Sequence, residues 1–131
     1  MIQGLHHIAI LCSDREKSLN FYRAIGFEIV SCTIRPERCD EIINMRGHTI
    51  ALELFISNDR PQRVTDPEAY GLRHIAFCVY GLDELNNFLN GCGYSPEPIR
   101  KDSFTGEKMF FVKDPDGLPI EFREEKSKEN K

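Results

Sequence analysis

The stretch Gly4-Leu5-His6-His7-Ile8-Ala9-Ile10 decides the fold, because the chain repeats it as Gly71-Leu72-Arg73-His74-Ile75-Ala76-Phe77. The two copies are 67 residues apart (74 − 7). Each copy is an alternating run with β-branched residues, a pattern that predicts a strand. Successive side chains of a strand point to opposite faces, so each repeated histidine shares a face with the alanine two residues further on. Two matching histidines on two matching strands predict a site built across an internal duplication.

The rest of the chain supports two copies of one β-α-β-β-β module. In the first copy we expect strands near residues 3–12, 27–35, 40–46 and 49–57, and a helix near 14–25 that starts with a capping box of Ser13 and Glu16. In the second copy we expect strands near 72–80, 107–113 and 118–123, and a broken, Pro-rich extended piece at 94–100 that would lie at a sheet edge. We also expect a helix near 82–90 whose inward residues are Leu82, Leu85, Phe88 and Leu89. The predicted fold class is therefore α+β. One domain over residues 1–124 would contain modules at about 3–57 and 72–124, a linker at 58–71 and a charged flexible tail at 125–131.

Composition limits the classes of function. The 131 residues fit one ordinary domain, and a net charge of −4 without a basic run argues against nucleic acid as a partner. No apolar stretch approaches the roughly 20 residues of a membrane span, and the first residues lack the pattern of a signal peptide. The five cysteines are odd in number and form no CxxC motif, which argues against a disulfide scaffold or a zinc ribbon. We expect a cytoplasmic protein with reduced cysteines.

Each module also carries a glutamate inside an apolar strand run near its end. Glu53 follows His7 by 46 residues (53 − 7), and Glu121 follows His74 by 47 (121 − 74). A buried carboxylate is costly unless it is paired or bound to metal. One such histidine or glutamate alone is usually hydrogen-bonded or solvated, but four in register across a duplication favour one metal site. The predicted cofactor is one divalent ion held by His7, Glu53, His74 and Glu121, with zinc or nickel preferred and cobalt, manganese and iron compatible.

These motifs resemble the vicinal oxygen chelate superfamily, and within it the glyoxalase I-like (lactoylglutathione lyase-like) proteins. The resemblance covers about residues 3–124. It rests on both His-Ile-Ala openings, on Asn20-Phe21-Tyr22 followed by Gly26-Phe27, and on Phe111-Val112-Lys113-Asp114-Pro115-Asp116-Gly117 followed by Ile120-Glu121. It implies paired βαβββ modules whose sheets curl around a metal, with the four ligands named above.

The resemblance also implies an activity. The protein would be a metal-dependent lyase or isomerase that acts on a 2-oxoaldehyde–thiol adduct through a metal-stabilised enediolate. Glu121 is the first candidate for the catalytic base and Glu53 the second. The partners expected are a small-molecule substrate and a second copy of the chain in a homodimer. In glyoxalase I each site is shared between two chains, whereas in other members one chain supplies the whole site.

The sequence departs from bacterial glyoxalase I at two positions. An arginine four residues after the first histidine is replaced by Leu11, and an asparagine four residues after the first glutamate is replaced by Ser57. Two expected contacts to glutathione carboxylates are thus absent. The candidates to replace them are Arg35, Arg38, Arg73 and Arg100, and the candidates to line a pocket are Phe104, Met109 and Phe111.

Other functions on the same fold stay open. A thiol transferase or an iron dioxygenase is possible, although a dioxygenase normally uses two histidines and one carboxylate. The alternative from a different class of function is a metal-free protein that binds and sequesters a small molecule. The fold does not fix the chemistry, so metal content would separate the enzymes from the sequestering protein.

Overall fold

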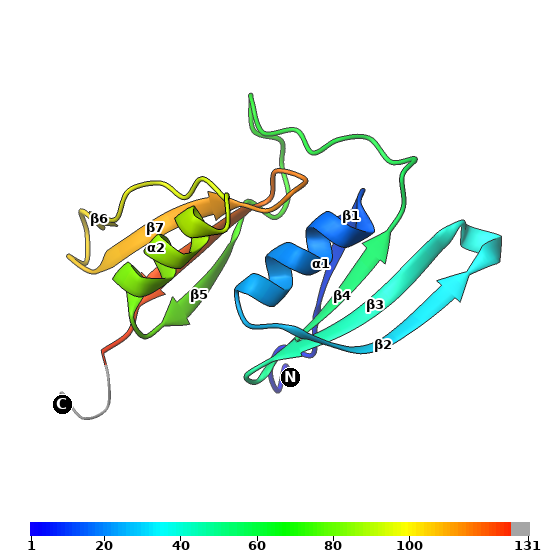
Figure 1. Cartoon of the computed structure of the whole chain (residues 1–131), viewed down its shortest axis with the longest axis horizontal. Coiled ribbons are helices and arrows are strands. Elements are labelled where there is room, and N and C mark those ends of the chain that lie inside the picture. The colour runs from blue at the N-terminus through cyan, green and yellow to red at the C-terminus, as the bar shows by residue number, and fades with distance from the viewer. Residues whose placement is uncertain (127–131) are drawn as a thin grey trace. The chain divides into compact units, whose positions relative to one another are not determined.

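The structure, a computed structural model, describes residues 1–126 and divides into two compact units, Met1–Gln62 and Arg63–Lys131. The first unit contains β1 (Ile8–Cys12), α1 (Arg15–Ala24), β2 (Glu28–Arg35), the short 3-10 helix η1 (Pro36–Arg38), β3 (Asp40–Gly47) and β4 (Ile50–Ile56). The second contains β5 (Ile75–Val79), α2 (Leu82–Gly91), β6 (Arg100–Lys101), β7 (Lys108–Lys113) and β8 (Pro119–Glu124). Each unit thus has the predicted β-α-β-β-β order (Figure 1). The predicted tail at 125–131 lies, from residue 127 on, outside the described residues.

Each unit is built on one four-stranded mixed sheet with the same topology. The strand order is β1-β4-β3-β2 in the first sheet and β5-β8-β7-β6 in the second. The first and last strands of each module pair in parallel, and the remaining neighbours pair antiparallel. Neither sheet is closed into a barrel (Figure 1). The prediction of an α+β fold made of two βαβββ modules is confirmed.

Alternating residues divide each sheet into a core face and a face that carries functional groups. In the first unit the core side chains of the sheet are Ile10, Cys12, Ile43, Met45, Leu52 and Leu54. Helix α1 adds Leu19, Phe21 and Tyr22, all almost fully buried. In the second unit the corresponding core side chains are Ile75, Phe110, Val112, Ile120 and Phe122, with Leu82 and Leu89 from α2. A β-strand with one buried face must present its intervening side chains on the other face, where chemistry is possible.

Several predicted boundaries and contacts are wrong. Asp14, and not Ser13, is the N-cap of α1, and its Oδ1 accepts a hydrogen bond from the backbone N–H of Lys17 at 3.0 Å. Serine and aspartate both favour the N-cap position, and Asp14 is the one that directly precedes the helix. Phe88 on α2 is 52% exposed instead of inward, because the buried stripe of that helix is narrow. The piece expected at 94–100 is irregular up to residue 99, and the short β6 (Arg100–Lys101) that follows it lies at the edge of the second sheet, as predicted.

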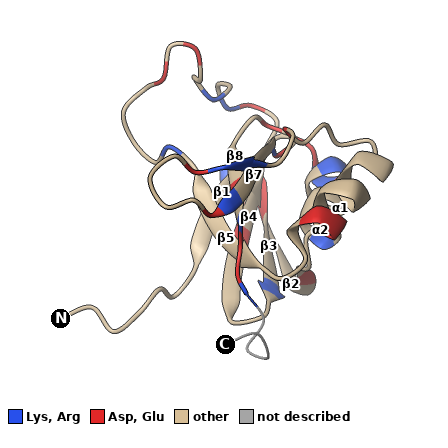
Figure 2. Ribbon diagram, turned by 90° about the vertical axis from the view of Figure 1, so that its left-hand side faces the viewer, with Lys and Arg blue, Asp and Glu red and all other residues tan. Residues whose placement is uncertain are grey.

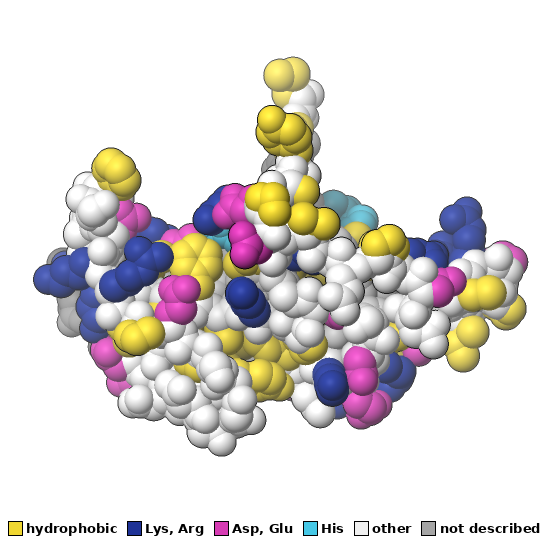
Figure 3. Space-filling model, turned by 90° about the horizontal axis from the view of Figure 1, so that it is seen from above, with side chains coloured by type: hydrophobic (Ala, Val, Ile, Leu, Met, Phe, Trp, Pro, Cys, Tyr) yellow, Lys and Arg dark blue, Asp and Glu magenta, His cyan; other side chains and the backbone are white. Residues whose placement is uncertain are grey.

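The remaining features of the fold are the cysteines, the N-terminal segment and the charged side chains at the surface. None of the five cysteines, all of which lie within the described residues, forms a disulfide, and Cys12 is the buried one. Residues 1–7 form no helix or strand and run as an extended segment to the end marked N in Figure 2. Acidic and basic side chains are interspersed on the face shown in Figure 3. Within residues 1–126, no helix has both the length and the apolar character needed to span a membrane.

Candidate metal and catalytic site

The first unit brings together the two side chains that its sequence predicts as ligands. His7 directly precedes β1, and Glu53 lies in the middle of β4, opposite Ala9 in the parallel register. Both side chains therefore project from the same face of the sheet. The His7 Nε2 atom lies 3.6 Å from Glu53 Oε1, and both side chains remain partly exposed. At 3.6 Å this contact is too long for a hydrogen bond.

The second unit repeats the pair more tightly. His74 directly precedes β5, and Glu121 lies in β8 opposite Ala76. His74 Nε2 lies 3.0 Å from Glu121 Oε1, and only 8% of the Glu121 side chain is exposed. The methyl group of Ala76 leaves room beside the carboxylate. A buried carboxylate held by an imidazole nitrogen has the donor chemistry that borderline divalent ions select.

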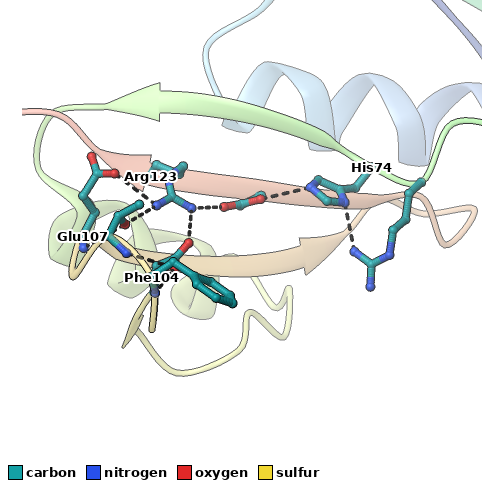
Figure 4. Close-up of polar contacts among 8 residues, drawn as sticks. His74, Phe104, Glu107 and Arg123 are labelled. Atoms are coloured by element: carbon teal, nitrogen blue, oxygen red, sulfur yellow. Dashed lines mark hydrogen bonds and ion pairs between the residues drawn. The ribbon is translucent and has the colours of Figure 1, made fainter.

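Glu121 has a second partner on its own strand. Arg123 Nη1 donates to Glu121 Oε2 at 2.7 Å, because side chains two residues apart in a strand share a face. The guanidinium is held in turn by Thr105 Oγ1 at 3.0 Å, Asp102 Oδ2 at 3.1 Å and Glu107 Oε1 at 3.2 Å (Figure 4). These hydrogen bonds, with that to Glu121 the largest contributor, raise the pKa of Arg123 above its usual range. His74 and Arg123 thus each hold one oxygen of the Glu121 carboxylate.

Each histidine that the sequence predicts as a ligand also has a neighbour at its Nδ1 atom. In the second unit Arg73 Nη1 lies 3.0 Å from His74 Nδ1. A guanidinium only donates, so Nδ1 accepts, and Nε2–H is the atom that donates to Glu121. In the first unit His6 Nδ1 lies 2.8 Å from His7 Nδ1. Arg73 therefore sets the tautomer of His74, whereas the contact between His6 and His7 requires only that one of the two rings donates and the other accepts.

The donor set fits a divalent ion. Two imidazoles and two carboxylates supply ligands that suit zinc, nickel, cobalt, manganese or iron, and their two negative charges balance the ion. In the described part of the chain, no three or more histidine, cysteine or acidic side chains gather into one cluster. The four predicted ligands are present as two pairs, one in each unit. That one ion joins the two pairs stays a prediction.

The comparisons with known proteins identify the family. Residues 4–122 match the model of the Glyoxalase/Bleomycin resistance protein/Dioxygenase superfamily. The chain belongs to this superfamily. The resemblance inferred from the His-Ile-Ala repeats and the Asp-Pro-Asp-Gly turn is thereby confirmed.

Similar proteins share almost the full length of this superfamily member. The uncharacterized protein YwkD of Bacillus subtilis is 43% identical over 127 residues, which cover 95% of this chain and 99% of YwkD. The crystal structure of a glyoxalase family protein from Enterococcus faecalis is 44% identical, with a TM-score of 0.88 over 92% of this chain and 97% of that chain. A protein named Glyoxylase I 4 from Arabidopsis thaliana is 27% identical and is covered over 70% of its length by 92% of this chain. Members of the superfamily typically bind a divalent metal, and the superfamily includes enzymes.

A cavity of about 800 Å³ lies within the second unit, and its lining includes Arg73 and Phe111, which both contact His74. Its walls come from the segment 63–71 and from sheet residues that include Phe111 and Arg100. The ring of Phe111 meets the imidazole of His74 edge to face, with centroids 5.1 Å apart. Of the residues predicted to line a pocket, Phe111 does so, whereas Phe104 is 96% exposed. A volume of this size is typical of small-molecule sites.

Arg123 is a residue of the site that the motifs of the sequence did not indicate. Its position two residues after Glu121 was a sufficient signal for a shared face. Its other partners lie on the loop 102–107, and strand periodicity does not reveal that contact. Arg73, considered as a contact to glutathione carboxylates, instead pairs with Glu68 at 3.1 Å and contacts His74. Arg35 pairs with Asp40 at 2.7 Å.

Proposed function

We propose that this superfamily member is a metal-dependent lyase or isomerase of glyoxalase I type. It would convert the hemithioacetal of a 2-oxoaldehyde and a thiol into a 2-hydroxyacyl thioester. The observation that carries the proposal is the His74–Glu121 pair, at 3.0 Å on the sheet face opposite the core, with its counterpart His7–Glu53 in the other unit. A repeated imidazole–carboxylate pair is suited to hold an ion and to move a proton.

In this proposal His7, Glu53, His74 and Glu121 hold one divalent ion, with zinc or nickel preferred. When bound, such an ion supplies Lewis-acid polarisation of the substrate carbonyl and stabilises negative charge on its oxygen. The histidines bind as neutral imidazoles, which means that His74 Nε2 must release the proton it now shares with Glu121. Arg73, which faces the other ring nitrogen, must then rearrange because Nδ1 becomes the protonated atom.

The proton transfer is assigned to Glu121, with Glu53 as the second candidate. The carboxylate takes the proton from the carbon that bears sulfur and oxygen, and returns it to the neighbouring carbon. The hydroxyl proton moves from the oxygen of the first carbon to that of the second, so the first becomes the thioester carbonyl and the second the hydroxyl. No bond to sulfur breaks, and no oxidant or reductant is consumed, so the reaction is an isomerisation. Arg123 holds Glu121 Oε2, which orients the carboxylate while a proton is on or off it.

We further propose that the protein acts on its small-molecule substrate as a homodimer. Proteins of this superfamily commonly act as dimers on small molecules. Mixing a His7→Ala variant with a His74→Ala variant tests whether sites are shared between chains. Recovery of up to about one quarter of the wild-type activity, by random pairing of the two chains, would indicate shared sites. A mixture as inactive as either variant indicates sites within one chain.

The proposal is tested by metal analysis and turnover together. Wild-type protein should contain one divalent ion per site and should isomerise hemithioacetals of methylglyoxal with small thiols. His74→Ala should lose the ion, and Glu121→Gln should lose both ion and turnover. Glu124→Gln, on the same strand, is the matched control and should retain both. A metal-loaded wild type that leaves such adducts of both configurations unchanged would refute the assigned reaction. A metal-free wild type that binds small molecules would instead favour a sequestering protein.

A further inference from the structure

Arg73 joins the candidate site to the wall of the cavity in the second unit. One end of its guanidinium, Nη1, lies 3.0 Å from His74 Nδ1. The opposite edge faces Glu68: Nε lies 3.2 Å from both carboxylate oxygens, and Nη2 lies 3.1 Å from Oε1. A guanidinium is planar and rigid, so its two ends cannot move independently. A displacement of Arg73 from His74 is therefore carried to Glu68.

Glu68 belongs to the segment 63–71, which supplies one wall of the cavity. All residues of this segment are exposed, so polar contacts carry much of its attachment to the rest of the unit. Arg63 Nη2 ties the start of the segment to its end by donating to two backbone oxygens just after it, at 2.8 and 2.9 Å. A β-bridge between Thr65 and Glu68 closes a turn within it. The ion pair of Glu68 with Arg73 is the side-chain contact that links this turn to the candidate site.

The contact with Arg73 keeps His74 in a form that opposes the ion. A guanidinium has only donors, so Nδ1 of His74 carries a lone pair, and the ring proton is on Nε2, 3.0 Å from Glu121 Oε1. In the proposed site the ion binds that same Nε2 atom, which needs a lone pair there and places the proton on Nδ1. An Nδ1–H group and a guanidinium are both donors, and two donors that face each other repel. Binding of the ion by His74 therefore requires Arg73 to leave Nδ1.

The equivalent position of the first unit carries no such conflict. His6 is the counterpart of Arg73 in the repeat, and its Nδ1 lies 2.8 Å from His7 Nδ1. An imidazole can accept as well as donate, so His6 can accept a hydrogen bond from His7 Nδ1–H while His7 Nε2 keeps a lone pair. The replacement of a histidine by an arginine at one position of the repeat thus makes the pair of the second unit resist an ion.

We infer that Arg73 is a positioning residue that couples binding of the ion by His74 to the segment 63–71. This coupling rests on the metal site of the proposed function, and it adds a link between the ion and the shape of the cavity. Without the ion, Arg73 holds both His74 and Glu68. With the ion, Arg73 leaves His74, Glu68 moves with it, and the wall of the cavity takes a second position. By linkage, a small molecule that fits one wall position better changes the affinity for the ion by the same factor.

Nitrogen NMR of the imidazole rings tests the first step in the metal-free protein. At about pH 8, where an ordinary histidine is neutral, His74 of the wild type should carry its proton on Nε2. This is the form that the contact with Arg73 demands. A wild type whose His74 carries the proton on Nδ1 would overturn the inference, because Arg73 would then not have to move.

A zinc titration followed by NMR tests the coupling itself. In the wild type, zinc should shift the backbone amide resonances of the segment 63–71, and these shifts should saturate together with that of His74. Arg73→Gln should lose most of the shifts in the segment. It should also bind zinc about threefold to tenfold more tightly, because the glutamine oxygen can accept from Nδ1–H. Arg100→Gln, which removes the same charge from the cavity lining, is the matched control: it should keep the shifts and gain less affinity.

The possible results separate this coupling from the proposed function. If zinc binds the wild type without shifting the segment 63–71, or binds Arg73→Gln no more tightly than Arg100→Gln, the coupling is refuted while the metal site stands. If both zinc results are as expected but hemithioacetals are not turned over, the coupling stands and the proposed reaction fails. If Arg73→Gln binds zinc and the wild type does not, Arg73 is the barrier to the ion, and the proposed activity of the native chain fails. If neither protein binds zinc, both proposals fail.

Discussion

Arg123 Nη1 lies 2.7 Å from Glu121 Oε2, so the carboxylate assigned to proton transfer is anchored by a cation on its own strand. The opposite oxygen faces His74 at 3.0 Å. A carboxylate fixed at both oxygens keeps one orientation, and misplacement of a catalytic group by about 1 Å can reduce the rate about 100-fold. Arg123 is thus a positioning residue for Glu121.

Replacing Arg123 by glutamine should lower kcat at least tenfold while KM changes little, because substrate binding does not depend on this contact. The buried Glu121 would also lose its charged partner, which should reduce the unfolding free energy by about 1–3 kcal/mol. Steady-state kinetics and urea unfolding measure the two effects. Arg123→Lys should restore part of kcat, since a single ammonium still reaches the carboxylate. A different result would indicate that Arg123 has a purely structural role: Arg123→Gln does not fold, but Thr105→Val and Arg123→Lys both have normal kcat.

Asp102 links the same network to pH. The amide N–H of Phe104 donates to Asp102 Oδ1 at 2.7 Å, and this hydrogen bond, followed by that from Arg123, lowers the pKa of Asp102 below its usual 3.8. A depressed pKa in the folded state adds stability that is present above the unfolded value and is lost as pH falls through the folded value. The stability difference between wild type and Asp102→Asn should therefore persist at pH 7 and shrink below about pH 3.8. Carboxyl carbon NMR of Asp102 checks the direction, and an apparent pKa at or above 3.8 would contradict it.

Ser18 offers a test of the core that is independent of the site. Its hydroxyl oxygen is fully buried in α1 and has no hydrogen-bond partner among the described residues. A buried hydroxyl without a partner costs free energy, and alanine also has the higher helix propensity. Ser18→Ala should raise the unfolding free energy by about 0.5–1.5 kcal/mol. Asn20→Ala, an exposed position on the same helix, controls for propensity alone, so equal gains in both variants would exclude a cost from the buried hydroxyl.

The parts of the structure that follow from local alternation were predictable. The duplicated strand motif placed each histidine on the same face as an alanine. In the structure the parallel register puts that alanine opposite a glutamate, Ala9 opposite Glu53 and Ala76 opposite Glu121. Boundaries were less predictable because Ser13 and Asp14 are both good caps, and only the geometry at the first turn selects between them. Phe88 was wrongly predicted as a core residue because helical spacing indicates which side of a helix faces the core, but not how wide the covered strip of that helix is.

The parts of the site that depend on long-range packing were not predictable from spacing. The loop 102–107 reaches Arg123 across about 18 residues of chain, and nothing in a period-2 pattern encodes that contact. The cavity is likewise formed when the segment 63–71 lies against the sheet of the second unit. In the sequence this segment reads only as a polar linker with prolines, and Arg63 holds it by donating to two backbone oxygens.

The two glutamates of the repeat differ, and that difference predicts unequal roles. Glu121 is held at 3.0 Å by His74 with 8% of its side chain exposed, whereas Glu53 lies 3.6 Å from His7 with 28% exposed. A buried, oriented carboxylate is the better general base, and such a base contributes roughly 10²–10⁴ to the rate. At saturating metal, Glu121→Gln should therefore reduce kcat by about 10²–10⁴, and Glu53→Gln should reduce it at least tenfold less.

Metal affinity should separate the two functions of these side chains. Both substitutions should weaken binding of the ion, because each removes one negative ligand. Titrating zinc or nickel into each variant while recording kcat distinguishes the effects: activity of Glu53→Gln should recover as the ion is restored, and that of Glu121→Gln should not. Glu124→Gln should behave as wild type throughout. The opposite result is that Glu53→Gln stays inactive when it is saturated with the metal ion while Glu121→Gln recovers its activity. Glu53 would then be the base, and neither the exposure of a carboxylate nor the tightness of its pairing would determine which one transfers the proton.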